Sequence, residues 1–328
     1  MEKISIDPIT RLEGHGRIDI FLNDDGEVAN AYLVIPELRG FEKFAEGRPV
    51  EEMPRITPRI CGVCPEAHHM ASAKACDAVS HVEVPSAGKK LRELLYSAFY
   101  VADHTVHFYI LGAPDFVLGP DAPPAERNIL GVINKVGLDI GGKVIRCRGL
   151  AMDTVGLLGG KTIHPVGAIP GGVSKAINEE ERARIEAWAH ELVEFGHFSL
   201  QLFKDVVLGN QAYLDMILSD AYTAPMYYMG MVDSDNKVNF YDGLVRIVDP
   251  DGNEFVKYGP DEYLDVVAEH VEPWTYLKFP YLKEIGWKGF VTGKDSGVYQ
   301  ATPLSRLNAA DGMATPGAQE AYEEFYET

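Results

Sequence analysis

The sequence predicts an α+β fold with a central bundle of long helices and β-hairpins or small sheets around it. Three observations lead to this prediction. Residues 1–35 alternate apolar and polar side chains on both sides of the turn NDDGE. Residues 54–210 contain apolar stripes with helical spacing, and residues 225–300 return to strand-like patterns. Because no repeat, low-complexity tract or flexible linker separates these regions, we expect a single domain over residues 1–328.

The first two helices of the bundle follow a cysteine-containing segment. A loop with the letters RICGVC opens a helix through EAHHMASAKACDAV, and Ser86 is expected to cap a second, longer helix. The apolar stripe of this longer helix consists of Leu91, Leu94, Leu95, Ala98, Phe99, Ala102 and Val106. Their spacing of three and four residues is typical of a helix with one buried face.

The second half of the bundle is predicted from a further helical stretch and a capping signal. Residues 125–158 read as helical, although they contain several glycines. Residues 159–175 are dense in glycine and proline and predict a loop of defined shape. Asn178, with Glu181 three residues later, then forms a capping-box pattern for a helix that runs to about Val207.

Strand and helix signals mark the last hundred residues. The runs VNFYDGLVRIV and EFVKYG flank the turn DPDGN, a pattern that predicts a hairpin. In residues 315–328, Thr315 and Pro316 form a helix start. The apolar face of this helix is formed by Ala318, Ala321, Tyr322, Phe325 and Tyr326. Because no stop signal precedes Thr328, we expect an unfinished helix and a truncated C-terminus.

Composition excludes several classes of function. The formal net charge is −19, so a nucleic-acid duplex or an anionic membrane surface would be repelled. No apolar run approaches the ~20 residues that a membrane-spanning helix needs. Four cysteines in 328 residues are too few for a disulfide framework, which indicates a reducing cytoplasm.

The segment PRITPRICGVCPEAHHM raises the question of function, because a C-x-x-C pair stands beside two adjacent histidines. A thioredoxin-like redox pair would need a preceding strand, and RPVEEMPRITPR makes a poor one. A zinc site could use Cys61, Cys64, His68 and His69, although adjacent histidines point to different faces of a helix. A third possibility is a soft transition-metal site whose other thiolates lie far away in sequence, with Arg59 favouring the thiolate form.

The residues around this pair resemble the [NiFe]-hydrogenase large subunit. RICGVCPEAH is similar to the family's first metal motif, R-x-C-G-x-C-x-x-x-H. ITRLEGHGRI, LRGFEKFAEGRP, ADHTVHFYILGAPDF, GGKTIHPVGAIPGG and ATPLSRLN resemble further family segments and stand in the family's order over nearly the whole chain. In detail the sequence looks most like the methyl-viologen-reducing, or F420-non-reducing, group that works with heterodisulfide reductase in methanogens and related anaerobes.

This resemblance implies a nickel–iron centre and roles for three residues. Cys61 matches the cysteine bound terminally to nickel, and Cys64 matches one that bridges nickel to an iron carrying cyanide and carbon monoxide. In the family, dihydrogen is split heterolytically and a thiolate takes the proton. Glu13 in RLEGH matches the glutamate that passes this proton on, a role that suits a carboxylate whose pKa burial can tune.

The resemblance implies further roles around the centre. Glu42 matches a ligand of a distant magnesium or iron ion, and one carboxylate with waters is normal for magnesium. Asp103 matches a carboxylate that pairs with an arginine beside the active site, and His68 matches a histidine near the bridging sulfur. Six other histidines and cysteines are expected to fill the core or to satisfy hydrogen bonds: His69, His104, His107, His164, Cys76 and Cys147.

The resemblance breaks at the second C-x-x-C pair, which the family carries near its C-terminus. No cysteine follows Cys147, so this chain holds half of the metal ligands. A fragment or a split protein is expected, rather than a descendant that lost its metal, because RICGVC, RLEGH and RGFE are intact.

The function implied is that of the catalytic subunit of a cytoplasmic [NiFe]-hydrogenase. With so few cysteines the chain carries no iron–sulfur cluster, so an iron–sulfur small subunit must take the electrons. Other implied partners are a heterodisulfide reductase that contains flavin and a small electron-transfer subunit. The alternatives are a nickel-free scaffold subunit of an electron-transfer complex and, further off, a zinc-stabilised domain.

Overall fold

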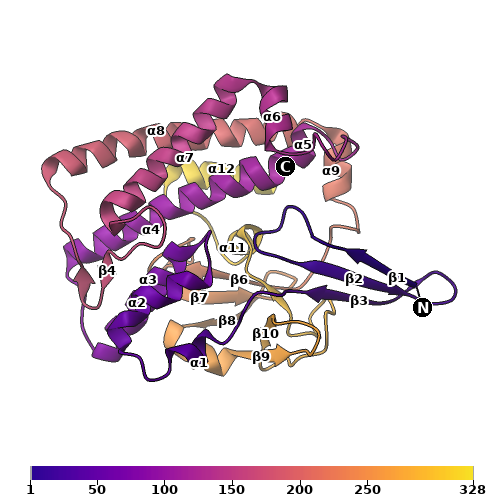
Figure 1. Ribbon diagram of the computed structural model, residues 1–328, viewed down its shortest axis with the longest axis horizontal. Helices are drawn as coiled ribbons and strands as arrows, with labels where there is room; N and C mark the ends of the chain where they lie inside the picture. Colours follow the sequence, from indigo (N-terminus) through magenta and orange to yellow (C-terminus); the bar gives the residue numbers. More distant parts are fainter. Residues whose placement is uncertain (1, 328) are drawn as a thin grey trace. The chain divides into compact units, whose positions relative to one another are not determined.

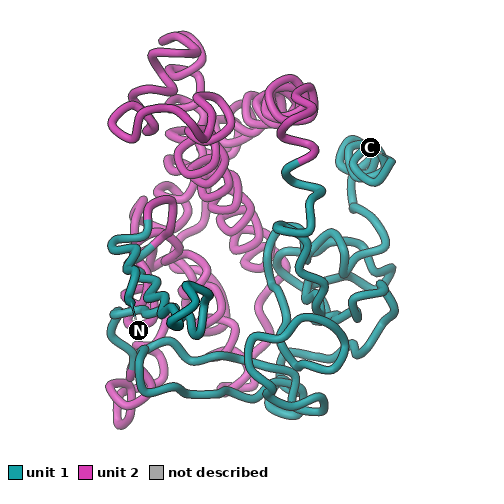
Figure 2. Tube along the Cα trace, turned by 90° about the vertical axis from the view of Figure 1, so that its right-hand side faces the viewer, with its two compact units in different colours: residues 1–9, 14–39, 216–328 teal, residues 10–13, 40–215 magenta. Residues whose placement is uncertain are grey.

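The computed structural model of the chain describes residues 2–327 and divides them into two compact units. Unit 1 consists of residues 1–9, 14–39 and 216–328, and unit 2 of residues 10–13 and 40–215 (Figure 2). Chain segments distant in sequence thus share unit 1. A single domain over the whole chain stays a prediction, and each unit is described by itself.

Unit 2 is helical. Its helices are α1 (Phe41–Ala45), α2 (Met53–Ile56), α3 (Pro65–Ser80), α4 (Ser86–Val106), α5 (Ala113–Val117), α6 (Ile129–Val136), α7 (Leu138–Gly159) and α8 (Glu179–Phe203), with α9 (Gln211–Ile217) after them. The long helices α4 and α7 pack along each other, and α8 packs on α7 (Figure 1). Residues from α4 and α7 form a core, Ala98, Phe99 and Val155, against which Cys64 of the cysteine motif is packed. The motif is therefore held against the centre of the bundle.

The helix ends follow local chemistry, with two differences from the prediction. Asn178 caps α8 through a complete capping box with Glu181, as predicted. Ser86 is the first residue of α4 rather than its cap, because Pro85 occupies the cap position without a side-chain hydrogen bond. The stretch predicted as one helix over 125–158 is broken at Gly137, whose φ of 93° is open to glycine and strained for other residues.

A glycine-rich loop follows α7 and carries the short hairpin of β4 (Ala168–Ile169) and β5 (Gly172–Val173). Arg92 of α4 donates hydrogen bonds to the carbonyls of Ile169 and Gly172 and pairs with Asp77 of α3. Asp77 in turn accepts the Gly171 N–H at 2.7 Å. These partly buried hydrogen bonds give the predicted loop its defined shape.

The N-terminal strands of unit 1 form an antiparallel sheet in the order β1 (Glu2–Ile6), β2 (Arg17–Leu22), β3 (Val28–Val34). Asn23 and Glu27 close the predicted hairpin between β2 and β3. The sequence suggested strand through the RLEGH segment as well, and this expectation was wrong. The backbone between β1 and β2 leaves the sheet at the cis Asp7–Pro8 bond and takes a positive φ at Arg11 and Gly14, so Glu13 lies on a loop.

The described residues in the rest of unit 1 form two more sheets, three α-helices and a short 3-10 helix (Pro260–Glu262). Its strands are β6 (Tyr227–Val232), β7 (Leu244–Val248), β8 (Glu254–Tyr258), β9 (Val267–Val271), β10 (Lys278–Leu282) and β11 (Tyr299–Gln300). One sheet has the order β11-β6-β7-β8, and β9 pairs with β10. The DPDGN segment joins β7 and β8, as predicted. The helices are α10 (Tyr263–Val266), α11 (Pro303–Asn308) and α12 (Pro316–Glu327).

The larger sheet of unit 1 packs on its own apolar core, whose buried members are Tyr227, Ile247, Tyr258 and Leu282. Among residues 2–327, no helix is both long enough and apolar enough to span a bilayer.

Candidate metal centre

The cysteine pair lies where a short 3-10 helix meets the start of α3. Residues Thr57–Ile60 form this 3-10 helix, Cys61 is extended, and Cys64 occupies the N-cap position of α3 with Pro65 after it. The Cys64 N–H donates to Cys61 Sγ at 3.1 Å, which closes the turn. The helix dipole at this end of α3 attracts negative charge, but burial has the larger effect on Cys64 and raises the pKa of its thiol. Since no strand precedes the pair, the thioredoxin-like alternative lacks its structural context.

Three metal-binding side chains meet at this turn. The ligand atoms of Cys61, Cys64 and His68 all lie within 4.8 Å of one another. Both cysteines are free thiols and all three residues are partly buried. Among the residues that the structure describes, this is the only group of three or more such side chains that could hold an ion.

His69, by contrast, faces away from the cysteines, and both of its ring nitrogens make hydrogen bonds to other parts of the chain. Its Nδ1 donates to the Pro54 carbonyl at 2.7 Å, and its Nε2 accepts the Ala168 N–H at 2.9 Å. This residue therefore satisfies hydrogen bonds in the core, as predicted. A zinc site with all four side chains is excluded, because neither ring nitrogen of His69 can reach an ion.

A hydrogen bond connects the carboxylate of Glu13 to the cysteine pair. The Cys61 thiol donates to Glu13 Oε1 over 3.9 Å, a long contact of the kind that sulfur makes. The loop that carries Glu13 belongs to the same unit as the cysteine motif, although β1 and β2 on either side of it do not. The break in the strand is thus what brings this carboxylate to the thiols.

The site is electrostatically suited to a cation. Burial raises the pKa of the Cys64 thiol, and the neighbouring Cys61 and the charges of Glu13 and Asp103 raise it further. Burial lowers the pKa of His68, which favours the neutral imidazole that binds metals. A cation placed among these groups would offset the cost of two thiolates, because opposite charge favours the ionised form.

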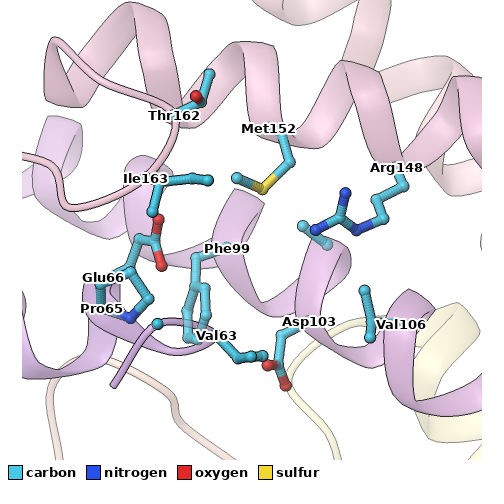
Figure 3. Close-up of a pocket in the computed structure, with 12 residues that line it drawn as sticks. Val63, Pro65, Glu66, Phe99, Asp103, Val106, Arg148, Met152, Thr162 and Ile163 are labelled. Carbon is cyan, nitrogen blue, oxygen red and sulfur yellow. The ribbon is translucent and has the colours of Figure 1, made fainter. Parts of the chain in front are cut away.

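A cavity of about 130 Å³ lies beside the turn (Figure 3). Its walls include Val63 of the turn, Phe99 and Asp103 of α4, and Arg148 of α7. Glu66 lies at one end of the cavity and Arg148 at the other (Figure 3). The Glu66 side chain is 1% exposed, and its Oε1 has no hydrogen-bond partner within residues 2–327.

Comparisons with known proteins agree on one family. A family model described as nickel-dependent hydrogenase matches residues 39–128, and one described as HoxL-like matches residues 3–38. An iron-sulfur subunit of the F420-non-reducing hydrogenase of Archaeoglobus profundus is 50% identical over 327 residues, covering 100% of this chain and 67% of the relative. A vhu subunit of the F420-non-reducing hydrogenase of Methanococcus voltae is 47% identical, with 100% and 75% covered.

A solved structure gives the same result at the level of the fold. A chain of an NAD+-reducing [NiFe]-hydrogenase in the H2-reduced state superposes with a TM-score of 0.90 at 33% identity, covering 99% of this chain and 70% of that one. The chain belongs to the nickel-dependent hydrogenase family. Within it, the chain is a large subunit of the F420-non-reducing type. The predicted fold and family are thus confirmed.

The structure brings most of the expected hydrogenase residues into one neighbourhood. Cys61, Cys64, His68 and Glu13 meet at the turn, and Asp103 acts on Cys64 through its charge and lines the adjacent cavity. Glu42 is exposed in the first turn of α1 and is not part of the three-residue group. The individual roles of these residues stay predictions.

Sequence reasoning missed Glu66. An acid in the first turn of a helix normally faces solvent and complements the helix dipole, so nothing in CPEAHH distinguished it. Burial raises the pKa of Glu66 to about 7, and the negative charge of Asp103 adds to this, while a backbone hydrogen bond and Arg148 oppose it. No local signal could have found it, because Glu66 is two residues from both Cys64 and His68 and such positions do not share a helix face.

Replacing Glu66 should remove a pH dependence of stability. Because the pKa is about 7 in the fold against an ordinary 4.5, the folded chain keeps this proton to higher pH, and stability falls as pH rises through that interval. Glu66→Gln should therefore gain stability relative to the natural chain, by about 2.5 kcal/mol more at pH 8 than at pH 5. Urea unfolding at the two pH values measures this, with Glu93→Gln on the exposed side of α4 as the control. An equal difference at both pH values would contradict it.

Proposed function

We propose that this chain catalyses the oxidation of dihydrogen as the large subunit of a hydrogenase. The observation that carries the proposal is the arrangement of Cys61, Cys64 and Glu13, in which two sulfurs share one turn and a carboxylate contacts the first sulfur. Thiolates are the soft ligands that nickel and low-spin iron bind well. A carboxylate beside a thiol can take up the proton that the reaction produces.

The donor set fits one half of a nickel–iron centre. Cys61 would hold the nickel, and Cys64 would help to hold both metals of the group, whose iron would carry cyanide and carbon monoxide. When bound, this group supplies the electron-rich metal pair at which dihydrogen is cleaved heterolytically. The buried apolar contacts of Cys64 with the α4–α7 core would exclude bulk water from one side of the centre.

The second pair of thiolates would come from outside these 328 residues. The chain has four cysteines, and the other two, Cys76 and Cys147, are buried and make other contacts. Cys76 is buried and donates to the Val50 carbonyl, and Cys147 is buried in an apolar cluster with Tyr109 and Phe195. The relatives named above are longer than this chain, which spans 67% and 75% of them. Either a continuation of this chain or a separate polypeptide could therefore bring the missing ligands.

Glu13 would carry the proton away from Cys61. Glu13→Gln keeps the size and a hydrogen-bonding amide but cannot accept a proton. We expect hydrogen uptake by the assembled enzyme to fall about 10²- to 10⁴-fold, with nickel content unchanged, because positioned proton transfer contributes about that much. Viologen-coupled hydrogen uptake and metal analysis measure the two quantities.

Glu13→Asp is the matched variant, since it keeps the charge and moves the carboxylate by one methylene. It should retain more activity than Glu13→Gln. Full activity in Glu13→Gln would show that Glu13 is not a proton carrier, and loss of nickel from Glu13→Gln would assign the lost activity to the metal site instead.

Three further residues would support the centre. His68 would stand near the bridging sulfur, and Asp103 would pair with an arginine supplied with the missing ligands. Glu42, an exposed carboxylate on α1, would provide one ligand of a magnesium or iron ion whose other positions are filled largely by water.

Electrons would leave through an iron–sulfur small subunit, and then through a small electron-transfer subunit to a heterodisulfide reductase in the cytoplasm. The relatives at 47–50% identity are subunits of F420-non-reducing hydrogenases by name, which supports a multisubunit assembly of that type. The low cysteine content supports a reducing compartment.

A further inference from the structure

The short segment that carries Glu13 has an unusual backbone. Residues 10–13, which we call the Glu13 loop, leave the sheet of unit 1, and the Ile9 N–H donates to the Gly16 carbonyl at 2.9 Å across the base of this excursion. Within the loop Arg11 takes a φ of 64°, a left-handed conformation that residues other than glycine rarely adopt. Such a conformation persists where the surrounding contacts hold it. The contacts of Arg11 therefore help to determine the path of the loop.

The Arg11 side chain joins the Glu13 loop to the helical unit. Its Nη2 donates to the Arg127 carbonyl and lies 3.8 Å from Asp115 Oδ1 in α5. The Arg127 guanidinium approaches the same carboxylate oxygen at 3.6 Å, so two arginines share one acid. The Nε of Arg11 is buried and has no hydrogen-bond partner within residues 2–327. Because an unsatisfied buried donor costs stability, stability alone does not explain this placement of Arg11.

The groups that receive Arg11 are fixed by contacts of their own. Arg127 precedes Asn128, the N-cap of α6, whose side chain accepts two backbone N–H groups of that helix. The Arg127 guanidinium also donates to the Pro120 carbonyl. Asp115 lies in the first turn of α5. The loop is therefore anchored to the ordered ends of two helices.

This anchor bears on the cysteine motif because only one residue separates Arg11 from Glu13. Glu13 Oε1 lies 3.9 Å from Cys61 Sγ, so a small displacement of the loop would break the contact. A misplacement of about 1 Å can reduce a reaction rate about 100-fold. Asp115 is 43% exposed, so water and salt screen its ion pairs. Loss of the anchor should therefore move Glu13 more than it destabilises the fold.

From these contacts we infer that Arg11 is a positioning residue, which fastens the Glu13 loop to α5 and to the start of α6 and thereby holds Glu13 against Cys61. The anchoring stands on the contacts of Arg11, whereas its effect on hydrogen uptake rests on the proposed function of Glu13. Arginine suits this task because its planar fork reaches a carbonyl and a carboxylate together. Lysine offers a single charged nitrogen.

Arg11→Met in the assembled enzyme tests the inference with two readouts. Amide deuterium exchange should become faster in residues 10–16 and stay unchanged in α4. Hydrogen uptake should fall about 10- to 100-fold with nickel content unchanged, because the carboxylate is present but misplaced. Arg11→Lys keeps the charge and a donor and should restore part of the uptake. Arg146→Met is the matched control and should change neither readout, since the Arg146 side chain is 64% exposed and pairs with Glu191 at the surface.

A double variant separates positioning from a general structural role. If Arg11 acts through Glu13 alone, adding Arg11→Met to Glu13→Gln should lower hydrogen uptake no further than Glu13→Gln does. A further loss as large as that of Arg11→Met by itself would overturn the inference. Unchanged deuterium exchange in residues 10–16, or loss of nickel from Arg11→Met, would also overturn it.

If Arg11→Met does not assemble, Asp115→Asn decides by the same measurements, because it removes the carboxylate that Arg11 shares. Faster exchange in residues 10–16 with lower uptake supports the inference, and natural values of both overturn it. Full uptake in Glu13→Gln together with faster exchange in Arg11→Met would confirm the anchoring and reject the proposed function of Glu13. Unchanged exchange in Arg11→Met together with an inactive Glu13→Gln would reject only the anchoring.

Discussion

Cys64→Ser is expected to abolish hydrogen uptake and nickel binding in the assembled enzyme. Cys64 is packed against the α4–α7 core and sits at the N-terminus of α3, where a serine oxygen fits but cannot supply a soft, bridging ligand. A bound metal contributes several kcal/mol to its reaction, and each 1.36 kcal/mol is a factor of ten. The loss should therefore exceed about a thousandfold. Hydrogen uptake and nickel per chain are the measurements, and Cys61→Ser should behave in the same way.

Cys147→Ala is the matched control for the loss of one thiol. Cys147 is buried among Tyr109 and Phe195 in an apolar cluster, so its removal should cost about 1 kcal/mol of stability and leave nickel in place. If Cys64→Ser kept its nickel and its activity, the metal role of the cysteine motif would be refuted.

The largest expected effect on stability is that of Arg92→Met. The Arg92 side chain is 1% exposed, is paired with Asp77 through both terminal nitrogens, and donates to two loop carbonyls. Methionine keeps the apolar stem but leaves Asp77, whose side chain is only 12% exposed, without its charged partner. Removing one partner of a buried ion pair typically costs about 3–5 kcal/mol. Chemical unfolding of the chain should show a loss of this size.

Arg182→Met on α8 provides the comparison for an arginine at the surface. Arg182 also pairs with two carboxylates, Glu179 and Glu186, but its side chain is 49% exposed. Water and salt screen exposed ion pairs, so this variant should lose little stability. Equal losses of stability in the two variants would mean that burial does not determine how much the Arg92 hydrogen bonds and ion pair contribute to stability.

The sequence predicted most of the helical unit because its signals are local. The Asn178 capping box and the apolar stripe of α4 each depend on residues within a few turns, and both elements are present. The break at Gly137 and the loop at Glu13 were not predicted, since each depends on backbone angles that pattern alone does not specify. The motif resemblance identified the cysteines and Glu13 as site residues, but it did not predict how their side chains are arranged.

Tertiary contacts explain what the sequence could not provide at the site. His68 and His69 are adjacent and identical in type, yet one faces the cysteines and the other is bound to Pro54 and Ala168, which lies 99 residues away. Glu66 has the local signature of an exposed acid at a helix start, and only the packing of α3 against the bundle buries it. Side-chain direction and burial of this kind arise from partners remote in sequence.

Nickel analysis of the natively purified assembly tests the central claim most directly. The account predicts about one nickel per copy of this chain, because Cys61 and Cys64 supply half of the ligands and a further pair of thiolates completes the centre. Absence of nickel from intact, anaerobically purified material would contradict it, and would favour a nickel-free scaffold subunit of an electron-transfer complex.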